Sequence, residues 1–123
     1  MEKVLVLHGG TGDMGQVEDI LKIEGLEFNL ASLADVKGHL SIAEYDFIFL
    51  DISGEEKNLD IIDSIHRKRP DLPVIVLSDS LSQKQARESF IRGATGYLPK
   101  PLNRMDVQSV ILLLPELVKR GRK

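Results

Sequence analysis

The sequence has no cysteine among its 123 residues. Disulfide bonds and thiolate chemistry are therefore excluded, and the composition suits the reducing cytoplasm. No apolar run approaches the roughly 20 residues that would span a bilayer. The first residues form a strand-like segment rather than a signal peptide. We expect a cytoplasmic protein that does not enter the membrane.

An excess of positive charge is also missing. Sixteen Lys and Arg face 19 Asp and Glu, which gives a net charge of −3. Nucleic-acid binding by this domain is not expected, because phosphates are neutralised by a broad basic surface. One basic cluster, at residues 119–123, is expected to be a solvated tail or the start of a linker. Residues 1–118 are of a length that fits one compact domain.

Short β-branched runs alternate with longer amphipathic stretches. The run Lys3–His8 is apolar on both faces, as in a buried parallel strand. Strands are predicted at residues 3–8, 26–31, 47–50, 74–77 and 96–98. Helices are predicted at residues 13–24, 33–43, 59–69, 82–92 and 104–118. Such alternation predicts a parallel sheet with right-handed helical crossovers. The expected fold is α/β, a flavodoxin-like three-layer sandwich with strand order 2-1-3-4-5.

Individual residues indicate where these helices begin and end. Asp13 and Ser32 are suited to cap the first and second helices. Gly25 and Gly93 follow the first and fourth helices, where glycine commonly ends a helix. Pro115 is expected to kink or end the last helix, because it lacks an N–H and clashes with the preceding turn.

Polar residues follow three of the predicted strands. Asp51 follows the third strand, Ser78 the fourth and Lys100 the fifth. In a sheet of this kind ligands bind outside the carboxyl ends of the strands, so these side chains should share one rim. The carboxylate is suited to act as a nucleophile, and the hydroxyl and amine to stabilise charge on a transferred group. The alternative is that the three are a loop cap, a turn residue and a surface lysine.

Three segments carry a family resemblance, namely residues 47–52, 70–78 and 93–101. The last of these has a Gly-Ala pair, an aromatic and a Lys-Pro pair at family spacing. Over essentially its whole length the chain resembles the response-regulator receiver domain of two-component phosphorelay signal transduction. The fold and function of that family are therefore expected here.

The resemblance also implies roles for individual residues. Asp51 looks like the phospho-acceptor and Ser78 like the switch hydroxyl that contacts the phosphoryl group. Tyr97 looks like the aromatic that reports activation, and Lys100 like the lysine that pairs with the acceptor. Pro101 resembles a family proline that often follows a cis bond.

The residues after the first strand depart from the family pattern. Receivers place two acidic residues there, which hold Mg²⁺ together with the acceptor, whereas this chain has His8 and Gly9. Mg²⁺ prefers oxygen ligands in octahedral geometry, so no metal cofactor is expected. Glu55 and Glu56 are interpreted as solvated loop acids. His8 is interpreted as a neutral histidine bonded to Asp51 or water, with pH sensing as the alternative.

The favoured hypothesis is an atypical receiver, or pseudo-receiver, that is not an enzyme and signals by binding proteins. A histidine kinase, an output domain or a second protomer are the expected partners. A rival motif is the G-x-G-x-x-G pattern of Gly10, Gly12 and Gly15, with Asp35 further along. It indicates an alternative, a small flavodoxin-like domain that binds a nucleotide or anion. Asp13 counts against it, because it would place negative charge beside a phosphate.

The last predicted helix has more apolar residues than one core-facing stripe requires, from Val107 to Val118. In the family, the face formed by the fourth helix, fifth strand and last helix often mediates dimerisation or output binding. Exposed leucines on this helix are therefore predicted to contact a second protomer or a downstream domain. The alternative is that they are buried.

Overall fold

The computed structural model describes residues 3–9, 14–33, 44–52, 56–79 and 82–121, with only the backbone described at residues 56–57 and 114–121. The strands are β1 (Lys3–His8), β2 (Glu27–Ser32), β3 (Phe47–Asp51), β4 (Val74–Ser78) and β5 (Gly96–Pro99). The helices are α1 (Gly15–Ile23), α3 (Asp60–Lys68), α4 (Gln83–Ile91) and α5 (Arg104–Gly121), together with a short 3-10 helix, η1 (Glu56–Leu59).

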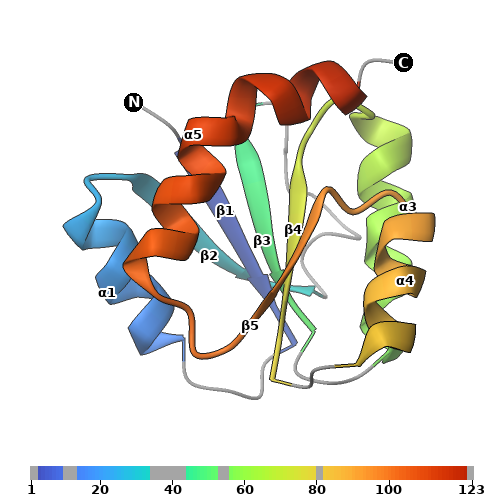
Figure 1. Ribbon diagram of the computed structural model, residues 1–123, viewed down its shortest axis with the longest axis horizontal. Coiled ribbons are helices and arrows are strands. Elements are labelled where there is room, and N and C mark those ends of the chain that lie inside the picture. Colours follow the sequence, from blue (N-terminus) through green and yellow to red (C-terminus); the bar gives the residue numbers. More distant parts are fainter. Residues whose placement is uncertain (1–2, 10–13, 34–43, 53–55, 80–81, 122–123) are drawn as a thin grey trace.

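The strands form one parallel sheet in the order β2-β1-β3-β4-β5, which confirms the predicted topology (Figure 1). β1 lies between β2 and β3, and pairs through His8 with both Ser32 and Asp51. The carboxyl ends of β1, β3, β4 and β5 therefore meet at the same edge of the sheet.

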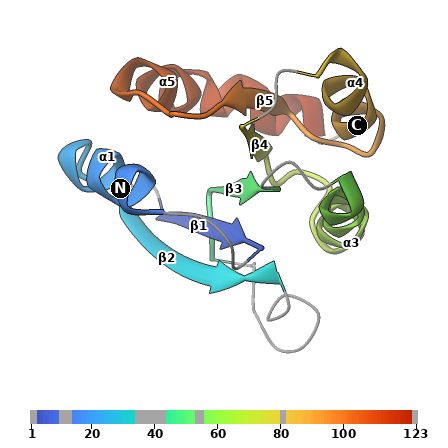
Figure 2. The same cartoon turned by 90° about the horizontal axis from the view of Figure 1, so that it is seen from below.

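Each face of the sheet is covered by a separate hydrophobic core. Successive side chains of a strand point to opposite faces, so Val4 and Leu5 enter different cores. One core joins the sheet to α1 and α5, and the other joins it to α3. In Figure 2, α1 and α5 lie on one side of the strands, and α3 and α4 on the other. The predicted three-layer α/β sandwich is thereby confirmed.

Most predicted helix ends agree with the structure. Gly25 and Gly93 follow α1 and α4 and have positive φ angles of 72° and 115°, which glycine adopts without steric cost. The first helix begins at Gly15, with Met14 as its N-cap residue and no side-chain cap, while Asp13 lies outside the described residues. Ser32, predicted to precede the second helix, is the last residue of β2. The predicted helix at 33–43 lies outside the described residues apart from Leu33, which is helical.

The last helix differs from its prediction at the C-terminal end. α5 continues through Pro115 to Gly121, so the proline does not end it. A proline removes only its own N–H bond and disturbs the turn before it, so the turns that follow can remain helical. In Figure 1, α5 changes direction along its length, as the expected kink would produce. Residues 119–121, expected in a tail or linker, are also helical. Among the described helices, none is long and apolar enough to cross a membrane.

Candidate functional site

The carboxyl ends of β3, β4 and β5 bring together the three rim residues that the sequence singled out. Asp51 is the last residue of β3 and pairs in register with Leu77, one residue before Ser78. Both Asp51 and Ser78 are fully buried. Lys100 follows β5, and its backbone N–H donates to the Ser78 carbonyl at 2.8 Å. The Lys100–Pro101 peptide bond is cis, as the resemblance implies.

A buried ion pair forms the centre of this site. The Lys100 Nζ lies 2.7 Å from Asp51 Oδ2, although the two residues are 49 positions apart in the sequence. The Lys100 side chain is 19% exposed, whereas the Asp51 side chain is fully buried. Because a buried carboxylate is costly without a partner, the Lys100 ammonium offsets the loss of water around Asp51.

The Ser78 and Tyr97 hydroxyls share an acceptor on α4 that the sequence did not single out. Ser78 Oγ donates to Gln85 Oε1 at 2.8 Å, and Tyr97 donates to the same oxygen at 2.6 Å. Gln85 is 3% exposed. Its backbone carbonyl accepts a hydrogen bond of 2.8 Å from the hydroxyl of Ser89, which is fully buried. The spacing of Gln85 and Ser89 is the feature of the sequence that could have indicated them, since residues four apart lie on the same face of a helix.

His8 and Gly9, at the carboxyl end of β1, contribute no carboxylate to the site. His8 is partly buried, and Gly9 is exposed. A Cβ atom built on Gly9 would lie 3.3 Å from Asn58 Nδ2, which donates to the Ile52 carbonyl at 3.0 Å. The position where the family has an acidic residue thus borders an amide donor.

The described residues of the rim do not by themselves supply the set of oxygen ligands that Mg²⁺ prefers. Within the described parts of the chain, no group of three or more His, Asp or Glu side chains could hold a metal ion. One Asp51 carboxylate oxygen, Oδ2, is already in contact with the Lys100 ammonium. Mg²⁺ requires several oxygen ligands in octahedral geometry, whereas the part of the rim that the structure describes provides the Asp51 carboxylate together with the Lys100 ammonium and the Asn58 amide.

The glycine-rich loop mostly lies outside the described residues. The residues outside the described parts of the chain include Gly10, Gly12, Asp13 and Asp35. Gly15 is the first residue of α1. Glu55 is also outside, and Glu56 is described only as part of the backbone of η1. The structure therefore gives no geometry for an anion at this loop.

Comparison with known proteins agrees with the fold. The family model for the response regulator receiver domain matches residues 14–112. The nitrogen assimilation regulatory protein NtrX of Azorhizobium caulinodans is 30% identical over 104 residues, which cover 81% of this chain and 23% of that protein. The DNA-binding transcriptional regulator NtrC of Azospirillum brasilense is 35% identical over 79 residues, 64% of this chain and 15% of that protein. The chain thus spans less than a quarter of the length of these two relatives.

Solved structures show the same architecture. NtrX from Brucella abortus aligns with 98% of this chain and 28% of its own, at 25% identity and a TM-score of 0.80. A CheY-like receiver domain from Methanospirillum hungatei aligns over 98% of this chain and 99% of its own, at 22% identity and a TM-score of 0.75. The parallel sheet, the aspartate at the end of β3 and the match over residues 14–112 together show that this chain belongs to the response regulator receiver domain family.

Proposed function

We propose that this receiver domain is an atypical one that signals by binding proteins, with Asp51 at the phospho-acceptor position but without Mg²⁺-dependent phosphorylation. The observation that carries this proposal is the pairing of buried Asp51 with Lys100 beside two positions, His8 and Gly9, that lack carboxylates. In phosphoryl transfer the cation normally neutralises charge on the transferred group. A phosphoryl group brings about −1.5 to −2 charge, which one lysine offsets only in part.

This proposal assigns the domain no enzymatic activity and no metal cofactor. Its role is to present a surface to a histidine kinase, an output domain or a second protomer. A cytoplasmic location is supported by its relatives, since NtrC is a DNA-binding transcriptional regulator. We do not propose nucleic-acid binding by this domain itself, because its net charge is −3.

Large apolar side chains are exposed on α4 and α5, and they support a second protomer as one partner. Phe90 and Ile91 of α4 are 51% and 71% exposed, and Leu112 and Leu113 of α5 are 80% and 51% exposed. Such side chains gain stability when a partner covers them. Light scattering at rising concentration should detect a dimer that Leu112→Gln weakens. A clean monomer at high concentration would contradict the homodimer.

The phosphorylation part of the proposal is tested by following amide shifts around Asp51 during titration with beryllofluoride or acetyl phosphate, with and without Mg²⁺. We expect no saturable Mg²⁺-dependent change in the amide shifts near Asp51. The Asp51→Asn variant should show the same lack of response to the titration. Saturable shifts that require both Mg²⁺ and Asp51 would overturn this part and show that the domain is a phosphorylatable receiver.

A further inference from the structure

Helix α4 is held on the domain by polar contacts. Its two buried residues, Gln85 and Ser89, are both polar, while its large apolar residues Phe90 and Ile91 are exposed. By contrast, α3 buries three isoleucines in the core, Ile61, Ile62 and Ile65. A helix is usually fixed by its apolar stripe, so the position of α4 depends on its hydrogen bonds and ion pairs to an unusual degree.

The first half of α4 is attached to the sheet through Gln85. Its side-chain oxygen accepts two hydroxyls from the sheet, Ser78 at 2.8 Å and Tyr97 at 2.6 Å. An amide oxygen has two lone pairs, so these two donors satisfy it. The N-terminal turn is closed separately by Ser82, whose hydroxyl accepts from the Gln85 backbone N–H at 3.1 Å.

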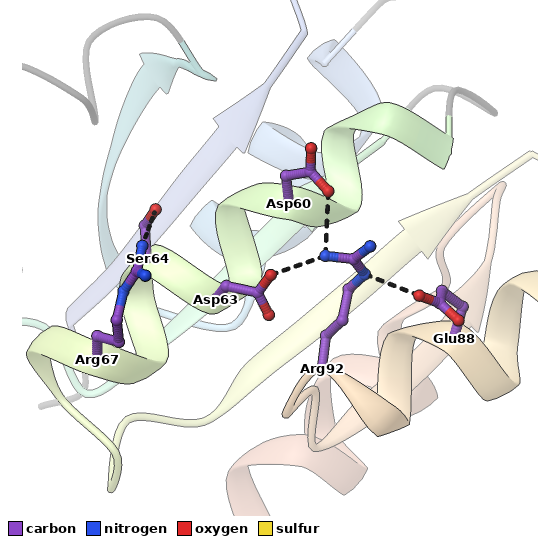
Figure 3. Close-up of polar contacts among 6 residues, drawn as sticks. All are labelled: Asp60, Asp63, Ser64, Arg67, Glu88 and Arg92. Atoms are coloured by element: carbon purple, nitrogen blue, oxygen red, sulfur yellow. Dashed lines mark hydrogen bonds and ion pairs between the residues drawn. The ribbon is translucent and has the colours of Figure 1, made fainter.

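The other end of α4 is attached to α3 through Arg92 (Figure 3). Its guanidinium lies 2.7 Å from Asp63 and 3.0 Å from Asp60, both on α3, and 3.0 Å from Glu88 within α4. These contacts do not involve the rim of the sheet. A change at the rim can therefore alter one attachment of α4 without directly altering the other.

Ser78 has one hydroxyl proton, and that proton is donated to Gln85. Ser78 also lies in the rim site, where its carbonyl accepts from the Lys100 backbone N–H at 2.8 Å. A ligand oxygen in the rim site that accepted the Ser78 proton would remove it from Gln85. The buried amide oxygen would then keep only the Tyr97 donor, at a cost in free energy that falls on α4.

We propose that Gln85 is a positioning residue that couples the Ser78 and Tyr97 hydroxyls to the order of the first half of α4. When either hydroxyl leaves Gln85, this half of the helix opens more often, while Arg92 keeps the other end on α3. The inference goes beyond the proposed function, because it concerns contacts of the unmodified domain and requires no phosphoryl group.

The test is amide hydrogen exchange of the whole chain, without any phosphodonor. Ser78→Ala and Tyr97→Phe each remove one hydroxyl. Each should speed exchange of the amides of residues 86–89, whose helical acceptors lie four residues earlier in the first turn, about five- to tenfold, as expected for one lost hydrogen bond. Exchange in β1 and β3 should not change, which separates local opening from global destabilisation. Ser78→Thr, which keeps the hydroxyl, should exchange at the rate of the unaltered protein. Ser64→Ala on α3 is the matched control and should leave α4 unaffected.

The role of Gln85 itself is tested by a double-mutant cycle. Gln85→Met should speed exchange in α4, and adding Ser78→Ala to it should have no further effect. Equal acceleration by Ser78→Ala in both backgrounds, or no acceleration in either, would overturn the inference. If Gln85→Met does not fold, Ser78→Ala and Tyr97→Phe still decide, because unchanged exchange of α4 in both would overturn it. Since no phosphodonor is used, these outcomes are independent of whether Asp51 can be phosphorylated.

Discussion

The ammonium of Lys100 lies 2.7 Å from a carboxylate oxygen of Asp51, at the point where the last residue of β3 meets the residue after β5. Asp51 is fully buried, and the Lys100 side chain is 19% exposed. The site is thus an ion pair in which the negative partner is shielded from water. Its stability depends on both partners being present.

Replacing Lys100 with methionine should destabilise the domain. The substitution keeps most of the aliphatic stem but leaves the buried Asp51 carboxylate without its ammonium. Breaking a buried pair on one side costs about 3–5 kcal/mol, and we expect a loss at the lower end, about 3 kcal/mol, because water reaches the lysine. Urea denaturation at pH 7 measures it. The control is Asp51→Asn combined with Lys100→Met, which should recover most of the loss. Equal losses in the single and double variants would contradict the expectation.

Restoring carboxylates after β1 should create a Mg²⁺ site. At Gly9 a new Cβ would meet Asn58 Nδ2 at 3.3 Å, and this flexible amide can move and donate to an introduced carboxylate. We expect His8→Asp with Gly9→Asp to gain a Mg²⁺-dependent rise in melting temperature that the unaltered domain lacks. A Mg²⁺ concentration ten times the dissociation constant would add about 1.4 kcal/mol of stability. Adding Asp51→Asn should abolish most of the gain. An equal rise in the unaltered domain would show that it already binds Mg²⁺.

Arg92, which is partly buried, should contribute more to stability than Arg67, an exposed arginine on α3. It contacts Asp60, Asp63 and Glu88, whereas Arg67 contacts Ser64 at 3.5 Å (Figure 3). We expect Arg92→Met to cost about 1 kcal/mol at low salt, because several charges form a network. The loss should shrink in 1 M salt, where charges are screened within about 3 Å.

Arg67→Met is the matched control and should change the urea midpoint little at either salt concentration. A loss that is the same at low and high salt would indicate that Arg92 acts through the packing of its stem instead of its charge.

The ion pair between Glu24 and Arg104 should make stability depend on acid pH. A hydrogen bond from Arg104 Nε, at 2.8 Å, lowers the pKa of the Glu24 carboxyl; partial burial opposes this, and Gln108 assists at 3.4 Å. Because the pKa is lower in the folded state, this stability is present above the ordinary glutamate pKa of about 4.3 and is lost as the pH falls through the folded value. The difference in urea midpoint between the unaltered domain and Glu24→Gln should thus be constant above about pH 5 and narrow below about pH 4.

Arg104→Gln should remove the same acid dependence, since it removes the donor. A difference that persists unchanged to pH 3 would show that the carboxylate charge of Glu24 does not stabilise the fold.

The sequence by itself determined the architecture. Runs such as Lys3–His8 are apolar on both faces and separated by helical crossovers, and such runs can be buried only in a parallel sheet covered on both sides. The same order of strands places Asp51, Ser78 and Lys100 at one edge, because parallel strands end together. The absence of carboxylates at His8 and Gly9 was also visible without a structure.

Only the tertiary structure decided which polar groups meet. The Gln85 oxygen receives two hydroxyls and Arg92 reaches α3 because of how α4 sits on the domain, and no local pattern encodes that placement. Helix patterns report which side chains turn inward but not which partner each one finds. The course of α5 beyond Pro115 was likewise undecided by the sequence, since a proline weakens a helix without specifying whether the following turns continue.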